Sequence, residues 1–142
     1  MHSLRRLHLS LHITCILVSL SLAFTLFDSS LFSWHPLLMS LAFLLFMSQG
    51  VLSAITLRSL PPGPQRVAAI QSHALMQLRS IACVIIGFGV IYRNKAIHGK
   101  AHFTSLHGKM GLVTLLLALL SPLLGAFSFK SLGLIHMLPG RI

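Results

Sequence analysis

The sequence has 142 residues, of which 55% are hydrophobic and 8% charged, and its single acid, Asp28, accompanies eleven lysines and arginines. A soluble domain carries about 25% charged residues, and a disordered chain needs low hydrophobicity, so both classes are excluded. The length suits an integral membrane protein with roughly four or five spanning helices of about 20 residues each. We expect no nucleic-acid binding, because the basic residues lie mostly in short joints where loops meet lipid headgroups.

Four long apolar runs predict four membrane-spanning helices in a single domain, residues 1–142. The expected helices are about 9–27, 36–57, 67–92 and 110–129. We interpret the first run as a retained helix, because no Ala-x-Ala-like cleavage site of a signal peptide follows it. A Pro-Pro-Gly-Pro segment at 61–64 predicts a turn, and the polar joint from Arg93 to Lys109 is the longest. The last stretch, 131–142, is too short to span a bilayer.

Membrane depth divides four of the nine histidines into two groups. Six basic residues lie near helix ends on the N-terminal side and four on the opposite side, which places the N-terminus in the cytosol. We call the N-terminal side the near side and the opposite side the far side. Since spans alternate, His35 and His107 lie on the far side, and His73 and His136 on the near side. Depth therefore pairs His35 with His107 and His73 with His136.

Two histidines that face each other from two helices form the arrangement that ligates a haem iron axially. Because intramembrane histidines are costly, a functional role is the default hypothesis, with interfacial histidines bonded to helix ends as the alternative. A stripe of small residues follows His107 on its own helix face: Gly111, Thr114, Ala118, Ser121 and Gly125. Such a face suits a flat macrocycle, although close helix packing in membranes also uses small residues.

Other polar features allow several interpretations. Arg79 lies near mid-bilayer, so we expect it to face the bundle or water. His98, Lys100 and His102 in the far-side joint could bind an anionic small molecule or a metal ion, or form a solvated loop. A transporter or channel lined by histidines is a rival to a haem protein.

Three segments resemble the cytochrome b561 family of transmembrane electron carriers, and in particular its short transmembrane reductases. They are residues 30–42 (SLFSWHPLLMSLA), 73–77 (HALMQ) and 99–111 (GKAHFTSLHGKMG). The resemblance implies a six-helix fold in which four central helices hold two b-type haems. It also implies that His35 and His107 ligate one haem iron, and that His73 and His136 ligate the other.

The resemblance further implies an enzyme that passes electrons from cytosolic ascorbate to monodehydroascorbate or ferric iron across the membrane. It places Arg66 at the ascorbate site, and Lys100, His102 and Ser105 at the far-side acceptor site. We also expect a homodimer in the lipid bilayer, with the endoplasmic reticulum or a vesicle membrane favoured over the plasma membrane.

The chain departs from the family where it ends, six residues after His136. The family's fifth helix should begin here, so we expect four spanning helices plus the start of a fifth. The alternative function is a truncated, non-catalytic form that holds one haem or none and acts as an interaction partner. We therefore expect substoichiometric haem on the near side.

Overall fold

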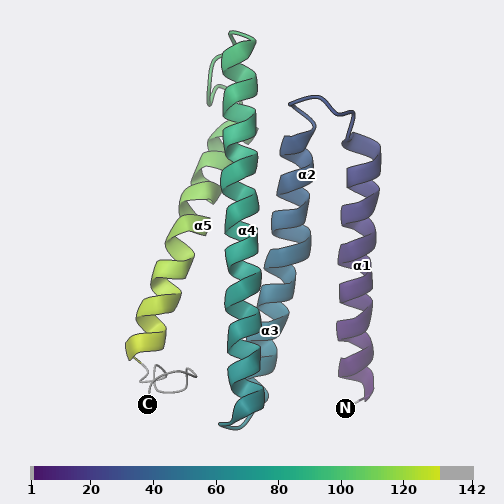
Figure 1. Ribbon diagram of the computed structural model, residues 1–142, viewed down its shortest axis with the longest axis vertical. Helices are drawn as coiled ribbons and strands as arrows, with labels where there is room; N and C mark the ends of the chain where they lie inside the picture. The colour runs from purple at the N-terminus through teal and green to yellow at the C-terminus, as the bar shows by residue number, and fades with distance from the viewer. Residues whose placement is uncertain (1, 132–142) are drawn as a thin grey trace.

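The computed structural model describes residues 2–131 as helices joined by short connections (Figure 1). In chain order the elements are α1 (His2–Leu26), α2 (Trp34–Ser40), the π-helical segment η1 (Leu41–Met47), α3 (Ser48–Ser59), α4 (Pro64–Ile97) and α5 (Leu106–Ser131). Together α2, η1 and α3 form one continuous helix. No strand occurs within residues 2–131, so the predicted all-α fold is confirmed for that part of the chain.

Four of these helical stretches are long and apolar enough to cross a membrane, as the sequence predicted. They are Leu9–Leu26, Trp34–Ser59, Pro64–Ile97 and Leu106–Phe127. Large apolar side chains cover the outside of the helices; Leu117 and Phe127, for example, are 61% and 81% exposed. Such a surface suits lipid rather than water. The expected start of a fifth helix, in residues 132–142, lies outside the described residues.

The helices run in alternating directions, which sets the two ends of the molecule. Figure 1 shows α1 beside the α2–α3 helix, α4 on the other side of that helix, and α5 crossing α4. The N-terminus and the α3–α4 turn lie at one end, the near side. The α1–α2 and α4–α5 connections lie at the other end, the far side.

Local hydrogen bonds, rather than hydropathy, decide where the helices end. Helix α4 continues to Ile97, five residues past the expected end at Tyr92, so the polar joint is shorter than predicted. Helix α5 begins at Leu106, because the Ser105 side-chain oxygen accepts a hydrogen bond from the Gly108 backbone N–H at 3.1 Å. The far-side connection is therefore a compact loop at 98–105. An N-cap of this kind carries little hydrophobic signal, so hydropathy alone placed the boundary four residues too late.

The α1–α2 connection fixes the start of α2. The Asp28 carboxylate accepts a hydrogen bond from the Ser30 backbone N–H at 2.9 Å. Hydrogen bonds from Ser30, chiefly from its side chain, hold the pKa of the Asp28 carboxyl below its ordinary value. Buried Ser33 donates its hydroxyl to the Ser30 carbonyl at 2.8 Å, and Trp34 packs edge-on against Phe27. This turn places His35, the residue after Trp34, at the far end of the bundle.

The closest packing joins the α2–η1–α3 helix to α4. Ala42 and Ser80 are fully buried where they meet, and the Ser80 hydroxyl donates to the Ala42 carbonyl at 2.9 Å. Small residues at this contact let the two backbones approach closely, as is usual between membrane helices. One residue further on, the Phe43 carbonyl accepts the Ser48 hydroxyl at 3.0 Å. The Ala42 and Phe43 carbonyls thus accept hydrogen bonds from side-chain hydroxyls. They lie in η1, where π-helical hydrogen bonding replaces the ordinary α-helical hydrogen bonding.

Candidate functional site

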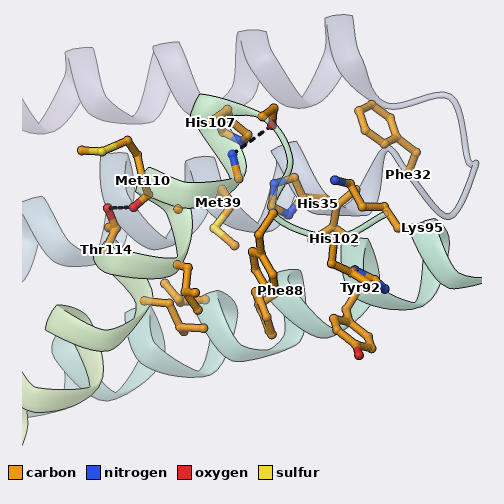
Figure 2. Close-up of a pocket in the computed structure, with 18 of the residues that line it drawn as sticks. Phe32, His35, Met39, Phe88, Tyr92, Lys95, His102, His107, Met110 and Thr114 are labelled. Atoms are coloured by element: carbon orange, nitrogen blue, oxygen red, sulfur yellow. Dashed lines mark hydrogen bonds between the residues drawn. The ribbon is translucent and has the colours of Figure 1, made fainter. Parts of the chain in front are cut away.

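A pocket of about 440 Å³ lies at the far end, between α2–η1, α4, and the loop and first turns of α5. Its walls are mainly apolar and aromatic, and include Met39, Phe43, Val84, Phe88, Gly111 and Leu115. The polar groups that line it are few and include His35, Lys95, His102 and His107 (Figure 2). An apolar cavity with a few convergent polar groups is the usual form of a cofactor or ligand site.

The histidine pair expected on the far side meets at this pocket. His35 is the second residue of α2 and His107 the second residue of α5. Their ring centroids lie 6.3 Å apart with the ring planes at 81°, which is the adjacency that membrane depth predicted. The His35 ring is half-buried and the His107 side chain is exposed. Ligation of a metal by this pair stays a prediction.

The His35 ring is held by a backbone carbonyl of the neighbouring helix. Its Nδ1 lies 2.9 Å from the Gly87 carbonyl oxygen of α4. A carbonyl only accepts hydrogen bonds, so Nδ1 carries the proton and donates it. In the neutral ring, the other nitrogen, Nε2, then keeps a free lone pair. Ligand histidines in metalloproteins are commonly oriented in this way.

His73 on the near side is held in the same manner. Its Nδ1 donates to the Gly50 carbonyl of α3 at 2.8 Å, and the ring is half-buried. Its expected partner, His136, lies outside the described residues. The pairing of His73 with His136 therefore stays a prediction.

The described residues do not form a closed cluster of metal ligands. Within residues 2–131, no group of three or more histidine, cysteine, aspartate or glutamate side chains could enclose a metal ion. Both cysteines, Cys15 and Cys83, are free. A closed protein-only metal site uses about four such ligands.

The 98–105 loop folds back on α4 through aromatic contacts. The His102 ring stacks on Tyr92 with centroids 4.0 Å apart, and Phe103 stacks on Phe88 at 6.3 Å. Phe103 has a φ of 55°, an uncommon backbone conformation for a bulky residue, and the stacking offsets its strain. The Lys95 ammonium donates to the Ala101 carbonyl at 3.3 Å. These contacts fix the outer wall of the pocket.

The far-side residues expected at an acceptor site divide into two groups. His102 and Ser105 line the pocket, whereas Lys100 is exposed and does not line it. The Ser105 oxygen already accepts the capping hydrogen bond of α5, which leaves its O–H donor and one lone pair for a ligand. Lys95 lines the pocket and was missed, because hydropathy ended the third helix at Tyr92. Its spacing from Phe88 and Tyr92, at i+7 and i+3, was the available signal.

On the near side, Arg66 lies in the first turn of α4. Its Nη1 donates to the Leu60 carbonyl at 3.3 Å, which braces the α3–α4 turn. Its Nε is buried and has no hydrogen-bond partner among the described residues. In the middle of α4, the Arg79 side chain is exposed among the described residues, and its orientation toward the bundle or water stays a prediction.

Only the upper part of the small-residue stripe belongs to the pocket. Gly111 and Thr114 line it, and a Cβ added to Gly111 would meet nothing within 4 Å. Ala118 is buried against the bundle, as the helix-packing alternative predicts. Ser121 and Gly125 are exposed and do not line the pocket. The small-residue stripe therefore lines the pocket near the start of α5 and packs against the bundle at Ala118.

The described helices and the far-end pocket define a multi-pass helical membrane protein with two adjacent histidines at one end. Comparison with known families gives a match to eukaryotic cytochrome b561 over residues 34–138. This match covers most of the chain and includes α2, α4 and α5. The chain belongs to the eukaryotic cytochrome b561 family, and the resemblance seen in the sequence is confirmed.

Curated relatives carry the same family relationship. The chain is 39% identical over 105 residues to Transmembrane reductase CYB561D2 of Mus musculus, which covers 69% of this chain and 47% of that protein. The Homo sapiens protein of the same name is 38% identical with the same coverage. Probable transmembrane reductase CYB561D1 of Mus musculus is 36% identical over 104 residues, covering 68% of this chain and 45% of that protein. The chain thus spans about half the length of these relatives. No solved structure matches it.

Proposed function

We propose that this chain binds a b-type haem between His35 and His107 and acts as the electron-carrying core of a transmembrane reductase. Membership of a cytochrome family and the reductase names of the relatives support electron transfer. The observation that carries the proposal is the pair of imidazole rings, 6.3 Å apart, at a largely apolar pocket.

The spacing of the rings fits a shared metal ion. Bonds from histidine nitrogen to a metal are about 2.0–2.1 Å, so two imidazoles on opposite sides of one ion have centres roughly 6 Å apart. The observed separation of 6.3 Å agrees with this value. His35 already presents a free Nε2, because its Nδ1 is engaged by Gly87. When bound, haem supplies a one-electron redox centre.

The other residues of the pocket would control the burial of the haem and the access of an electron acceptor to it. Met39, Phe43 and Val84 contribute apolar side chains to the inner wall of the pocket. Burial of this kind is one means by which a protein sets a haem potential. His102 and Lys95 lie at the outer wall, where an acceptor would approach. The pocket thus combines an apolar inner wall with polar side chains at its outer wall.

The finer proposal is the full path across the membrane. A second b-type haem between His73 and His136 would complete it, with cytosolic ascorbate as donor and monodehydroascorbate or ferric iron as acceptor. The unpartnered Nε of Arg66 supports a polar ligand at the near end. We further propose a homodimer in an endoplasmic reticulum or vesicle membrane.

Anaerobic addition of ascorbate to the purified, haem-loaded chain tests this function. We expect reduction of a b-type spectrum, followed by reoxidation when ferric chelate is added. A folded chain without haem would favour the histidine-lined transporter. A chain that binds haem but is not reduced by ascorbate would favour the non-catalytic interaction partner.

Lys95 and Lys100 are expected to assist an anionic acceptor. Replacing either with alanine removes a positive charge near the outer wall, which should slow reoxidation by an anionic ferric chelate by roughly two- to fivefold. Because the proposed ligands are untouched, the absorption spectrum should not change. Stopped-flow reoxidation at low ionic strength measures the effect.

Lys109→Ala is the matched control. Lys109 is exposed at the same end of the molecule, but unlike Lys100 it lies in the first turn of α5 and not in the 98–105 loop, and unlike Lys95 it does not line the pocket. It changes the net charge equally. Equal rates for all variants and the parent chain would mean that the loop is merely solvated.

A further inference from the structure

Two reciprocal hydrogen bonds join the α2–η1–α3 helix to α4. His35 of α2 donates through Nδ1 to the Gly87 carbonyl of α4. His73 of α4 donates through Nδ1 to the Gly50 carbonyl of α3. Each helix therefore contributes one histidine and one glycine carbonyl. The two contacts lie toward opposite ends of the same antiparallel helix pair.

Both glycines stand where the two helices approach closely. A Cβ added to Gly50 would lie 3.0 Å from Gln77 Nε2, and one added to Gly87 would lie 3.1 Å from Leu38 Cβ. Both separations are tighter than ordinary van der Waals contacts, but Gln77 Nε2 is the end of a flexible side chain, whereas Leu38 Cβ is fixed to its helix. Glycine therefore permits the approach that brings each carbonyl within reach of an imidazole. A carbonyl has two lone pairs, so it can accept the histidine in addition to its own helical bond.

The spacing of the two pairs differs by one residue, and η1 compensates for it. His35 and Gly50 are 15 residues apart, whereas His73 and Gly87 are 14 apart. An α-helix turns about 100° per residue, so one extra residue would rotate Gly50 away from His73. A π-helical turn closes its hydrogen bonds one residue later and so accommodates the extra residue. The Ser80–Ala42 hydrogen bond lies between the two histidine contacts and clamps the helices there.

We propose that Gly50 and Gly87 are positioning residues that set the tautomer of His73 and His35 before any cofactor binds. Their carbonyls hold the proton on Nδ1 and leave Nε2 as a free base aimed away from the carbonyl. The hydrogen bond of one ring nitrogen decides the state of the other. The use of Nε2 as an iron ligand rests on the proposed function; the tautomers do not.

Nitrogen NMR of the haem-free chain in detergent micelles tests the tautomers directly. Histidine labelled with ¹⁵N in the ring reports which nitrogen carries the proton, and His35→Gln and His73→Gln variants assign the signals. We expect both residues in the Nδ1–H form near neutral pH. An Nε2–H form, or averaging between the two, at either residue would overturn the proposal. Failure to bind haem leaves this result unaffected, so the proposed function fails separately.

Glycine variants test the positioning role. Gly87→Ala should abolish the Nδ1–H signal of His35 and leave that of His73, and Gly50→Ala should do the reverse. Gly89→Ala is the control on α4, because a Cβ there meets nothing within 4 Å. Circular dichroism checks that each variant stays helical. In haem-loaded chain, Gly87→Ala should also alter the low-spin spectrum. Retention of both tautomers in both variants would contradict the proposal.

A deletion tests the register without a bulky substitution. Removing Leu44, an exposed residue of η1, leaves His35 and Gly50 14 residues apart in the sequence, as His73 and Gly87 are. We expect both Nδ1–H signals to persist, because a plain α-helix then keeps the register. Loss of either signal, or of the fold, would show that η1 does not absorb a surplus residue and would overturn this part of the proposal.

Discussion

Replacing His107 with alanine is expected to remove most haem from the far-side site. The remaining His35 offers one nitrogen, so any haem that still binds should change from low spin to high spin. The loss in affinity should exceed the roughly 10- to 100-fold that follows removal of an outer-shell partner of a metal ligand. The ring of His102 also lines the pocket, but it is stacked on Tyr92 and is poorly placed to substitute. Titration of the haem-free chain with haemin, followed by absorbance, measures this effect.

His98→Ala is the matched control for that experiment. His98 lies on the same far side, is exposed, and hydrogen-bonds the Asn94 carbonyl of its own helix at 2.7 Å. It does not line the pocket. We expect haem binding equal to that of the parent chain. A full bis-histidine low-spin spectrum in His107→Ala, with every other far-side histidine intact, would mean that His107 is not the ligand.

Replacing Gly111 with leucine is expected to exclude haem by filling the pocket. The Gly111 backbone faces the cavity, and a Cβ there meets nothing within 4 Å, so the new side chain enters empty space. A leucine side chain should therefore cost little helix stability while it occupies the volume that a macrocycle needs. We expect more than a tenfold loss of haem affinity, equivalent to more than about 1.4 kcal/mol.

Gly125→Leu separates pocket filling from loss of a small residue. Gly125 lies on the same helix, is equally open to an added Cβ, and does not line the pocket. It should bind haem as the parent chain does. Equal haem affinity in the two variants would mean that the stripe below His107 serves helix packing alone.

Much of the far-side site could be predicted because it depends on helix direction and depth. Alternating spans brought His35 and His107 to the same end, and the structure places their rings side by side. Lys95 could not be found in the same way, because polar residues continue α4 past the apolar run. Where a helix leaves the membrane, hydrogen bonding rather than hydropathy decides its end.

The parts that were not predicted depend on contacts between helices. No local sequence pattern predicts that the Gly50 and Gly87 carbonyls accept hydrogen bonds from histidines of the neighbouring helix. The local sequence does not predict the π-helical turn either, since the Ser80 hydroxyl that donates to the Ala42 carbonyl comes from another helix, α4. Such features arise from tertiary packing, which overrides local propensity.

Haem content of a chain that keeps only the far-side pair tests the central claim most directly. His73→Ala combined with His136→Ala removes both near-side candidates and leaves His35 and His107. We predict one b-type haem per polypeptide by the pyridine haemochromogen assay, with a low-spin signal in electron paramagnetic resonance. A folded chain that binds no haem, or binds it only in a high-spin form, would contradict ligation by His35 and His107.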